Sequence, residues 1–254
     1  MRFRKKLYCA ATAAMILFSG TLAAAEETKP TAALDVSILS QYMWRGIDLS
    51  KHGVVIQPSM TMGYNGASLN LWGNFDTNNA AYDGAKYNET DVTLSYAMTF
   101  DLLTVSANYA YYALDAVEDG QEVYVTASLN TLLSPTLTIY RDIAHTPSFF
   151  VLAGISHSLP IYDKTTLTLG ATASYYYSDD SALTEVGSTD KYRNFHNGVV
   201  SATFNIPVNN YVTVKPTVSY SFPLSSAADD YIESVSLSEK SDFIYGGVVV
   251  SFAF

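Results

Sequence analysis

The sequence predicts an all-β protein, a transmembrane antiparallel up-and-down β-barrel of about 12 strands. Three observations predict this fold. From residue 33 onward, apolar and polar residues alternate with the period of two that separates the faces of a strand. Tight turns and longer polar connections follow one another between the alternating segments. The 20 Tyr and 12 Phe are spread through these short segments, and no apolar run there has the roughly 20 residues that a spanning helix needs.

Residues 1–25 are expected to be a signal peptide that is removed during export. A basic start is followed by an apolar run over 7–22 and by three alanines that end at Ala25, which favours cleavage after that residue. A membrane anchor is the alternative, but polar residues interrupt the run and leave it short for a bilayer span. The single cysteine, Cys9, lies in this segment. The mature chain, 26–254, is then expected to be a bacterial outer-membrane β-barrel without thiol chemistry.

The charge of the chain argues against nucleic acid as a partner. The formal net charge is -10, from 14 Lys and Arg against 24 Asp and Glu. Because residues 1–25 hold four of the basic residues and none of the acidic ones, their removal leaves a charge of -14. A phosphate backbone would be repelled by such a chain.

Twelve segments alternate in the manner of barrel strands. The first places Trp44 on its apolar face and Arg45 on its polar face, and Asn65 with Gly66 gives the tightest hairpin signal in the chain. The predicted strands are 33–45, 54–64, 67–76, 89–100, 103–114, 122–131, 136–143, 149–159, 165–177, 195–206, 211–222 and 243–254.

The connections and the aromatic residues fit a barrel in a membrane. Short turns are expected at the periplasmic end and longer loops outside, at 46–53, 77–88, 178–192 and 223–241. Aromatic residues gather at membrane interfaces. The predicted girdle at the outer interface consists of Trp44, Phe75, Tyr109, Tyr111, Tyr175, Tyr177, Tyr220 and Phe222.

The last strand carries a further indication of an outer-membrane barrel. Val248, Val250, Phe252 and Phe254 alternate up to the end of the sequence, which is typical of the terminal strand through which such barrels are recognised for insertion. Phe254 is therefore expected to act as an assembly signal. A soluble β-sandwich is the alternative, but it does not account for two bands of aromatic residues. The second, periplasmic band consists of Tyr64, Phe100, Phe204, Phe252 and Phe254.

One stretch of the chain resembles a known family. Residues 40–46, Ser-Gln-Tyr-Met-Trp-Arg-Gly, together with Gln57-Pro58 and Gly63-Tyr64, resemble the opening motif of the TorF-like outer-membrane porins, which begin with a similar Tyr-x-Trp-Arg-Gly strand end. The resemblance covers about the first fifth of the mature chain. It implies a barrel with a channel role and identifies no substrate.

Charged residues whose side chains are expected to face the lumen form the candidate functional site. Arg45 is expected to point inward at the outer end of the first strand, where opposed charges would create a transverse field that selects solutes. The alternative is a salt-bridge network that braces the lumen without selecting anything. The pore-lining or constriction candidates are Arg45, Glu89, Asp91, Glu122, Asp142 and Lys215.

The patterns for catalysis and metal binding are weak. His157 and Ser158 are adjacent in one strand, so their side chains point to opposite faces and cannot act as base and nucleophile for each other. The sequence predicts no catalytic residue, no metal site and no cofactor. An outer-membrane lipid hydrolase assembled from distant strands stays as a less favoured alternative.

Two functions of different classes follow from this pattern. The first is a channel for small hydrophilic solutes that prefers cations, because the outer connections are rich in Asp and Glu. The second is a non-conducting scaffold or adhesin that acts through loops such as 223–241. Strand number does not decide between them, since about 12 strands lie between filled barrels and open porins. The expected partners are outer-membrane lipids and lipopolysaccharide, the barrel-assembly machinery and small hydrophilic solutes.

Overall fold

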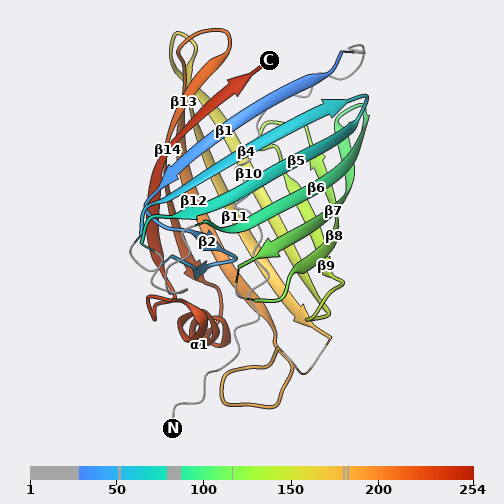
Figure 1. Ribbon diagram of the computed structural model, residues 1–254, viewed down its shortest axis with the longest axis vertical. Helices are drawn as coiled ribbons and strands as arrows, with labels where there is room; N and C mark the ends of the chain where they lie inside the picture. The colour runs from blue at the N-terminus through green and yellow to red at the C-terminus, as the bar shows by residue number, and fades with distance from the viewer. Residues whose placement is uncertain (1–28, 51–52, 79–86, 116, 180, 182) are drawn as a thin grey trace.

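Twelve strands close into one antiparallel barrel in the described part of the computed structural model (Figure 1). The structure describes residues 29–50, 53–78, 87–115, 117–179, 181 and 183–254, so the predicted signal peptide lies outside the described residues. Consecutive wall strands are neighbours, and the last strand pairs with the first to close the ring. The wall strands are β1 (Thr31–Leu39), β4 (Val55–Tyr64), β5 (Ala67–Asp76), β6 (Tyr87–Phe100), β7 (Leu103–Leu114), β8 (Gly120–Leu129), β9 (Thr136–Asp142), β10 (Ser148–Tyr162), β11 (Thr165–Ser178), β12 (Arg193–Pro207), β13 (Val212–Pro223) and β14 (Phe243–Ala253).

The predicted barrel is confirmed, and alternation locates its strands closely. The predicted segments 67–76 and 103–114 coincide with β5 and β7. Asn65 and Gly66 take positive φ values of 51° and 82° between β4 and β5, which is the turn geometry that an Asn-Gly pair favours.

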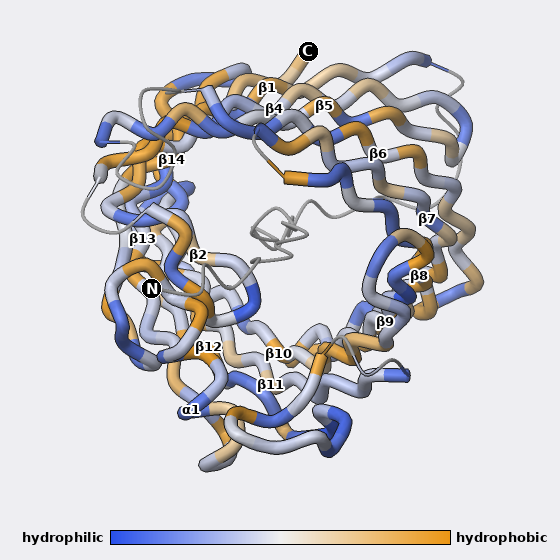
Figure 2. The backbone as a smooth tube through the Cα atoms, turned by 60° about the horizontal axis from the view of Figure 1, so that its bottom comes forward, coloured by the Kyte–Doolittle hydropathy of each residue, from blue (hydrophilic) through white to orange (hydrophobic). Residues whose placement is uncertain are grey.

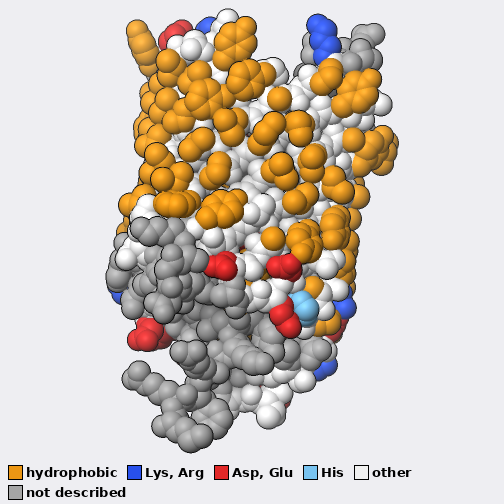
Figure 3. Space-filling view, in the orientation of Figure 1, with side chains coloured by type: hydrophobic (Ala, Val, Ile, Leu, Met, Phe, Trp, Pro, Cys, Tyr) orange, Lys and Arg blue, Asp and Glu red, His pale blue; other side chains and the backbone are white. Residues whose placement is uncertain are grey.

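The two ends of the barrel differ. Tight turns such as Asn65–Gly66 lie at one end, here named the turn end, and the longer connections lie at the other, here named the loop end. On the face shown in Figure 3, apolar side chains cover the outside of the wall, and acidic side chains gather beyond their loop-end edge. Leu94, Val125 and Val218 are examples of large apolar residues that are about half exposed on the outside of the wall. The described residues include no helix long and apolar enough to cross a membrane.

The first predicted strand, 33–45, is too long. β1 ends at Leu39, and a short hairpin follows, formed by β2 (Met43–Trp44) and β3 (Ile47–Asp48) as a separate two-stranded sheet. Figure 2 shows β2 inside the ring of wall strands. Alternation reports which way a side chain faces but not which sheet its strand joins, so the pattern runs from β1 into the hairpin without a break.

Trp44 is therefore not part of the predicted aromatic girdle. Its side chain is only 4% exposed and belongs to a cluster of buried residues with Tyr42 and Trp72 inside the barrel. The fold of the hairpin carries it away from the lipid-facing surface. The other seven girdle residues lie toward the loop-end termini of wall strands and are partly exposed: Phe75, Tyr109, Tyr111, Tyr175, Tyr177, Tyr220 and Phe222.

The connection 223–241 contains a helix that the sequence analysis did not predict. Helix α1 (Ser226–Val235) begins after Ser225, whose side chain accepts a hydrogen bond from the Ala228 backbone N–H at 3.2 Å. Ala228 and Ile232 are buried, so one face of the helix packs against the barrel. Just beyond the helix, the Leu237 N–H donates to the carbonyl of Asp48, which ties this connection to the inward hairpin.

Candidate functional site

Arg45 lies at the tip of the inward hairpin and forms an ion pair with the barrel wall. Arg45 and Gly46 both have positive φ, at 48° and 81°, which closes the hairpin. The Arg45 Nη2 atom donates to both carboxylate oxygens of Glu122 on β8, at 2.7 and 2.9 Å. The side chains are 5% and 1% exposed, respectively. The sequence therefore placed Arg45 inside the barrel, and the structure adds its partner.

Aromatic rings surround the Arg45 guanidinium group. The guanidinium carbon lies 4.2 Å from the ring centre of Phe150, 4.8 Å from Trp44, 5.3 Å from Tyr140 and 5.6 Å from Tyr176. Each distance lies within the range of a cation–π contact. The rings limit access of water to the ion pair, and exclusion of water strengthens the attraction between the two charges.

The backbone of the hairpin tip is held by a buried histidine. His196 on β12 donates from Nε2 to the Arg45 carbonyl at 2.9 Å, because a carbonyl can only accept. Its Nδ1 atom must then accept, and the hydroxyl of Tyr192 lies 2.8 Å away. Burial raises the pKa of Tyr192, so its hydroxyl keeps the proton that it donates. The sequence analysis missed both residues as supports, since only the fold brings the hairpin tip to them.

Two further tyrosines bind the acidic candidates. The Tyr112 hydroxyl donates to Glu122 Oε2 at 2.9 Å, and the Tyr42 hydroxyl donates to Glu89 Oε2 at 2.9 Å. Asp91 lies two residues from Glu89 on the same inward face of β6 and is only 2% exposed. Neither carboxylate oxygen of Asp91 receives a hydrogen bond from a described N–H or hydroxyl group. Asp91 is thus a buried carboxyl group beside that of Glu89, and no described N–H or hydroxyl group donates a hydrogen bond to it.

The remaining candidates divide between the two halves of the barrel. Asp142 on β9 pairs in register with Glu122, is buried, and accepts a hydrogen bond from the Ala144 N–H at 2.8 Å. Lys215 lies apart, toward the turn end of β13, with its Nζ atom 3.9 Å from Asp35 Oδ1. The structure therefore brings five of the six candidates together at the loop end and places Lys215 elsewhere.

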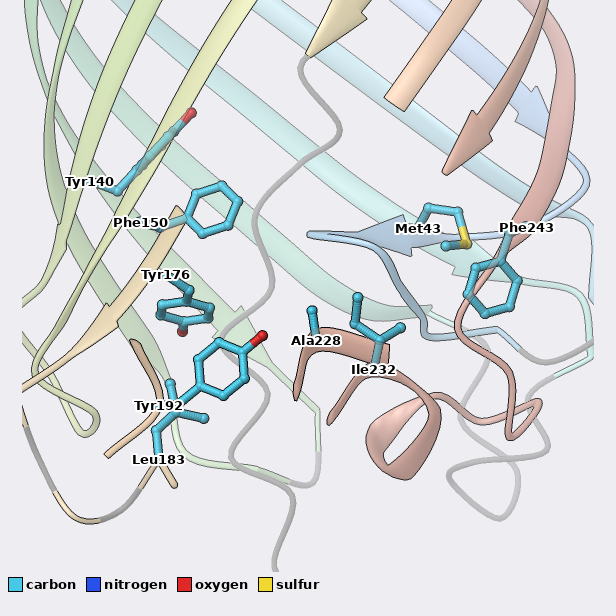
Figure 4. Packing of buried hydrophobic residues seen from close by; sticks show 9 residues of the cluster. All are labelled: Met43, Tyr140, Phe150, Tyr176, Leu183, Tyr192, Ala228, Ile232 and Phe243. Atoms are coloured by element: carbon cyan, nitrogen blue, oxygen red, sulfur yellow. The ribbon is translucent and has the colours of Figure 1, made fainter. Parts of the chain in front are cut away.

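A second buried cluster fixes the hairpin and α1 to the wall (Figure 4). Met43 comes from the hairpin, Ile232 from α1, and Tyr140, Phe150 and Tyr176 from three adjacent wall strands. These side chains pack as one apolar group beside the Arg45 ion pair. The hairpin and α1 are thus packed against the wall at the loop end.

Nearer the turn end, the inward side chains are mostly small and polar. Asn70 donates to Ser59 at 2.9 Å and to Thr61 at 2.8 Å, and on the opposite wall Thr203 and Thr217 share a hydrogen bond of 2.8 Å. All five are partly exposed. A polar, partly exposed inner face is typical of barrels whose lumen holds water.

The structure indicates no metal centre in the described chain. Among the described residues, no group of three or more His, Cys, Asp or Glu side chains is arranged to hold a metal ion. Two of the buried acids at the loop end have other partners: Glu122 binds Arg45 and the Tyr112 hydroxyl, and Glu89 binds the Tyr42 hydroxyl.

Comparisons with known proteins agree with this architecture. No family model and no curated protein matches the sequence. Among solved structures, the NanC porin matches with a TM-score of 0.58 and 13% sequence identity, over 86% of this chain and 98% of that one. An outer-membrane channel from Pseudomonas putida F1 gives a TM-score of 0.47 and 10% identity, over 91% of this chain and 97% of that one.

The chain has the fold of an outer-membrane porin. At this level of identity the likeness concerns the fold and carries no substrate. The porin-like barrel and its apolar outer belt support an outer-membrane location.

Proposed function

We propose that this porin-like barrel is a channel for small hydrophilic solutes and that it prefers cations. The observation that carries the proposal is the excess of buried carboxyl groups over buried Lys and Arg side chains. Among the described residues, Arg45 is the one basic residue whose side chain is buried to a similar degree as the acids. The buried acids are Asp35, Asp48, Asp76, Glu89, Asp91, Glu122 and Asp142.

The connections at the loop end support the same sign. Residues 178–192 and 223–241 each contain several Asp and Glu but only one Lys. Their negative potential acts over a Debye length of about 8 Å at physiological salt and would enrich cations at the mouth of the barrel. This is consistent with the channel role that the resemblance to TorF-like porins implies.

The ion pair of Arg45 and Glu122 would form the narrowest part of the path. The hairpin places a positive charge among several carboxylates, which is the transverse arrangement that orients charged solutes in pores. The same contacts also brace the hairpin against the wall. Bracing and selection are compatible, because a constriction selects only when its side chains are held in place.

Single-channel recording tests the proposal. The refolded mature chain in a planar bilayer should give discrete conductance steps, and detergent without protein serves as the control. Absence of steps from protein that migrates as a folded, heat-modifiable barrel would refute the channel and favour the scaffold or adhesin function.

A further inference from the structure

Four neighbouring strands carry a row of basic and aromatic side chains on the outside of the barrel at its loop end. Arg141 on β9 pairs in register with Phe149 on β10, Phe149 pairs with Tyr177 on β11, and Tyr177 pairs with Arg193 on β12. Each residue lies one position from the loop-end terminus of its strand or at that terminus. The row therefore follows the loop-end edge of the wall across these four strands.

Contacts within the row hold its two cations against the aromatic rings. The guanidinium carbon of Arg141 lies 4.5 Å from the centre of the Phe149 ring, and that of Arg193 lies 4.2 Å from the Tyr177 ring. The two rings meet edge to face at 6.4 Å. Cation–π contacts of this kind orient each guanidinium group without neutralising it.

The basic groups outnumber the acid that they contact. Asp179 forms an ion pair with Arg141, and its backbone carbonyl accepts from the exposed Lys191 Nζ atom. Arg193 donates from Nε to the Ser178 carbonyl at 3.3 Å. Each guanidinium group has five N–H donors, so most of them have no bond to a described residue. Arg141 and Lys191 thus contact one acidic residue, Asp179, and Arg193 contacts Ser178, whereas the connection 178–192 as a whole is acidic.

Other sectors of the same rim have the opposite character. Tyr111 donates its hydroxyl to Asp119, and the Tyr220 hydroxyl lies 3.4 Å from the Asp242 carboxylate. In those sectors the aromatic residues are paired with acids, whereas between β9 and β12 they are paired with arginines. The rings of this sector therefore contact cations, whereas Tyr111 and Tyr220 contact acids.

We propose that Arg141, Arg193 and Lys191 bind a phosphate group of lipopolysaccharide, with Phe149 and Tyr177 in contact with the start of its acyl chains. At the edge of an apolar belt, phosphate groups and acyl chains of one lipid lie side by side, which matches the cations and rings of the row. Arginine forms charge-assisted hydrogen bonds to phosphate oxygens. The proposal concerns lipid binding on the outer wall and is independent of the channel function.

Binding to purified, refolded protein in a zwitterionic detergent tests this site. The ligands are lipopolysaccharide, the same lipid after phosphatase treatment, phosphatidylglycerol and inorganic phosphate, with affinity measured by native mass spectrometry or thermophoresis. The test variants are Arg141→Gln, Arg193→Gln and the double variant. The matched control is Lys29→Gln with Lys164→Gln, which removes the same charge from exposed positions at the turn end.

We expect each single variant to weaken lipopolysaccharide binding about tenfold, corresponding to about 1.4 kcal/mol, and the double variant to weaken it further. The control should bind like the parent protein, and Arg141→Lys should retain part of the affinity. The site would be refuted by unchanged binding in the double variant, or by equal loss in the control. Equal affinity for phosphatase-treated lipid would refute phosphate recognition. Equal affinity for phosphatidylglycerol, or equally strong competition by inorganic phosphate, would refute the assignment to lipopolysaccharide.

Discussion

Arg45 and Glu122 are 77 residues apart in the sequence and form a buried ion pair at 2.7 Å that connects the inward hairpin to the barrel wall. This pair fixes the position of the hairpin within the barrel.

Removing the cation should widen the path. Arg45→Ala is expected to raise single-channel conductance and cation preference, because it removes bulk and the central positive charge. It also removes the cation from the buried Glu122 carboxylate, at a cost of about 3–5 kcal/mol in stability. The double variant Arg45→Ala with Glu122→Ala avoids that cost and should still conduct more than the parent. Lower conductance in the double variant would contradict the constriction.

Asp91 and Asp35 should respond in opposite ways to the same substitution. Asp91 lacks a hydrogen-bond donor, so Asp91→Asn should raise the free energy of unfolding by on the order of 1 kcal/mol. Asp35 accepts a hydrogen bond from the Ser251 hydroxyl, and its Oδ1 atom lies 3.9 Å from Lys215 Nζ. Asp35→Asn should therefore lower the free energy of unfolding by about 1–2 kcal/mol. Urea titration of both refolded variants measures these changes. A loss of stability in Asp91→Asn would mean that its charge is compensated.

Two properties of Gly46 should be needed at the hairpin tip: its tolerance of a positive φ and its lack of a side chain. At φ +81° any other residue is strained, and a Cβ atom would lie 3.0 Å from Asn197 Cβ and 3.2 Å from Ile232 Cδ1. Gly187 has a similar φ of +74° but nothing within 4 Å of such a Cβ. Both Gly→Ala variants should lose about 1–2 kcal/mol to backbone strain. Gly46→Ala should lose more and should also give noisier conductance steps. Equal losses would show that the hairpin tip is not tightly packed.

Phe254 should matter for assembly more than for the stability of the finished barrel. Its side chain is 74% exposed, while its backbone bonds to Ala32 hold the end of the chain in place. Phe254→Asp should reduce the amount of heat-modifiable barrel in the outer-membrane fraction of cells but leave refolding in detergent unchanged. Tyr162→Asp, at another exposed aromatic residue of the turn end, is the control and should assemble normally. Equal defects in the two variants would argue against a terminal recognition signal.

Much of the wall could be predicted from the sequence because alternation is a local property. Segments 67–76 and 103–114 match their strands, and the Asn65–Gly66 turn lies where its residue types require. The hairpin at Arg45 and helix α1 could not be predicted in the same way. Both depend on contacts inside the closed barrel, such as those of Ile232, which no local pattern contains.

The sequence predicts which charged side chains face the lumen but not which of them bond to each other. Inward parity placed Arg45 and Glu122 inside the barrel, because side-chain direction follows from strand position. The partner of Arg45 depends on the fold of the hairpin, and the buried contacts of His196 depend on where the hairpin tip arrives. For Trp44 the prediction of a lipid-facing side chain is wrong, because it requires the first strand to continue past Leu39, where β1 ends.

The reversal potential of the parent protein in a salt gradient tests the proposed function most directly. If the acidic groups determine selectivity, the zero-current potential should have the sign of cation selectivity. It should become smaller as the salt concentration rises, because salt screens the charges. Anion selectivity in the parent protein would contradict the assignment of function from the buried acids.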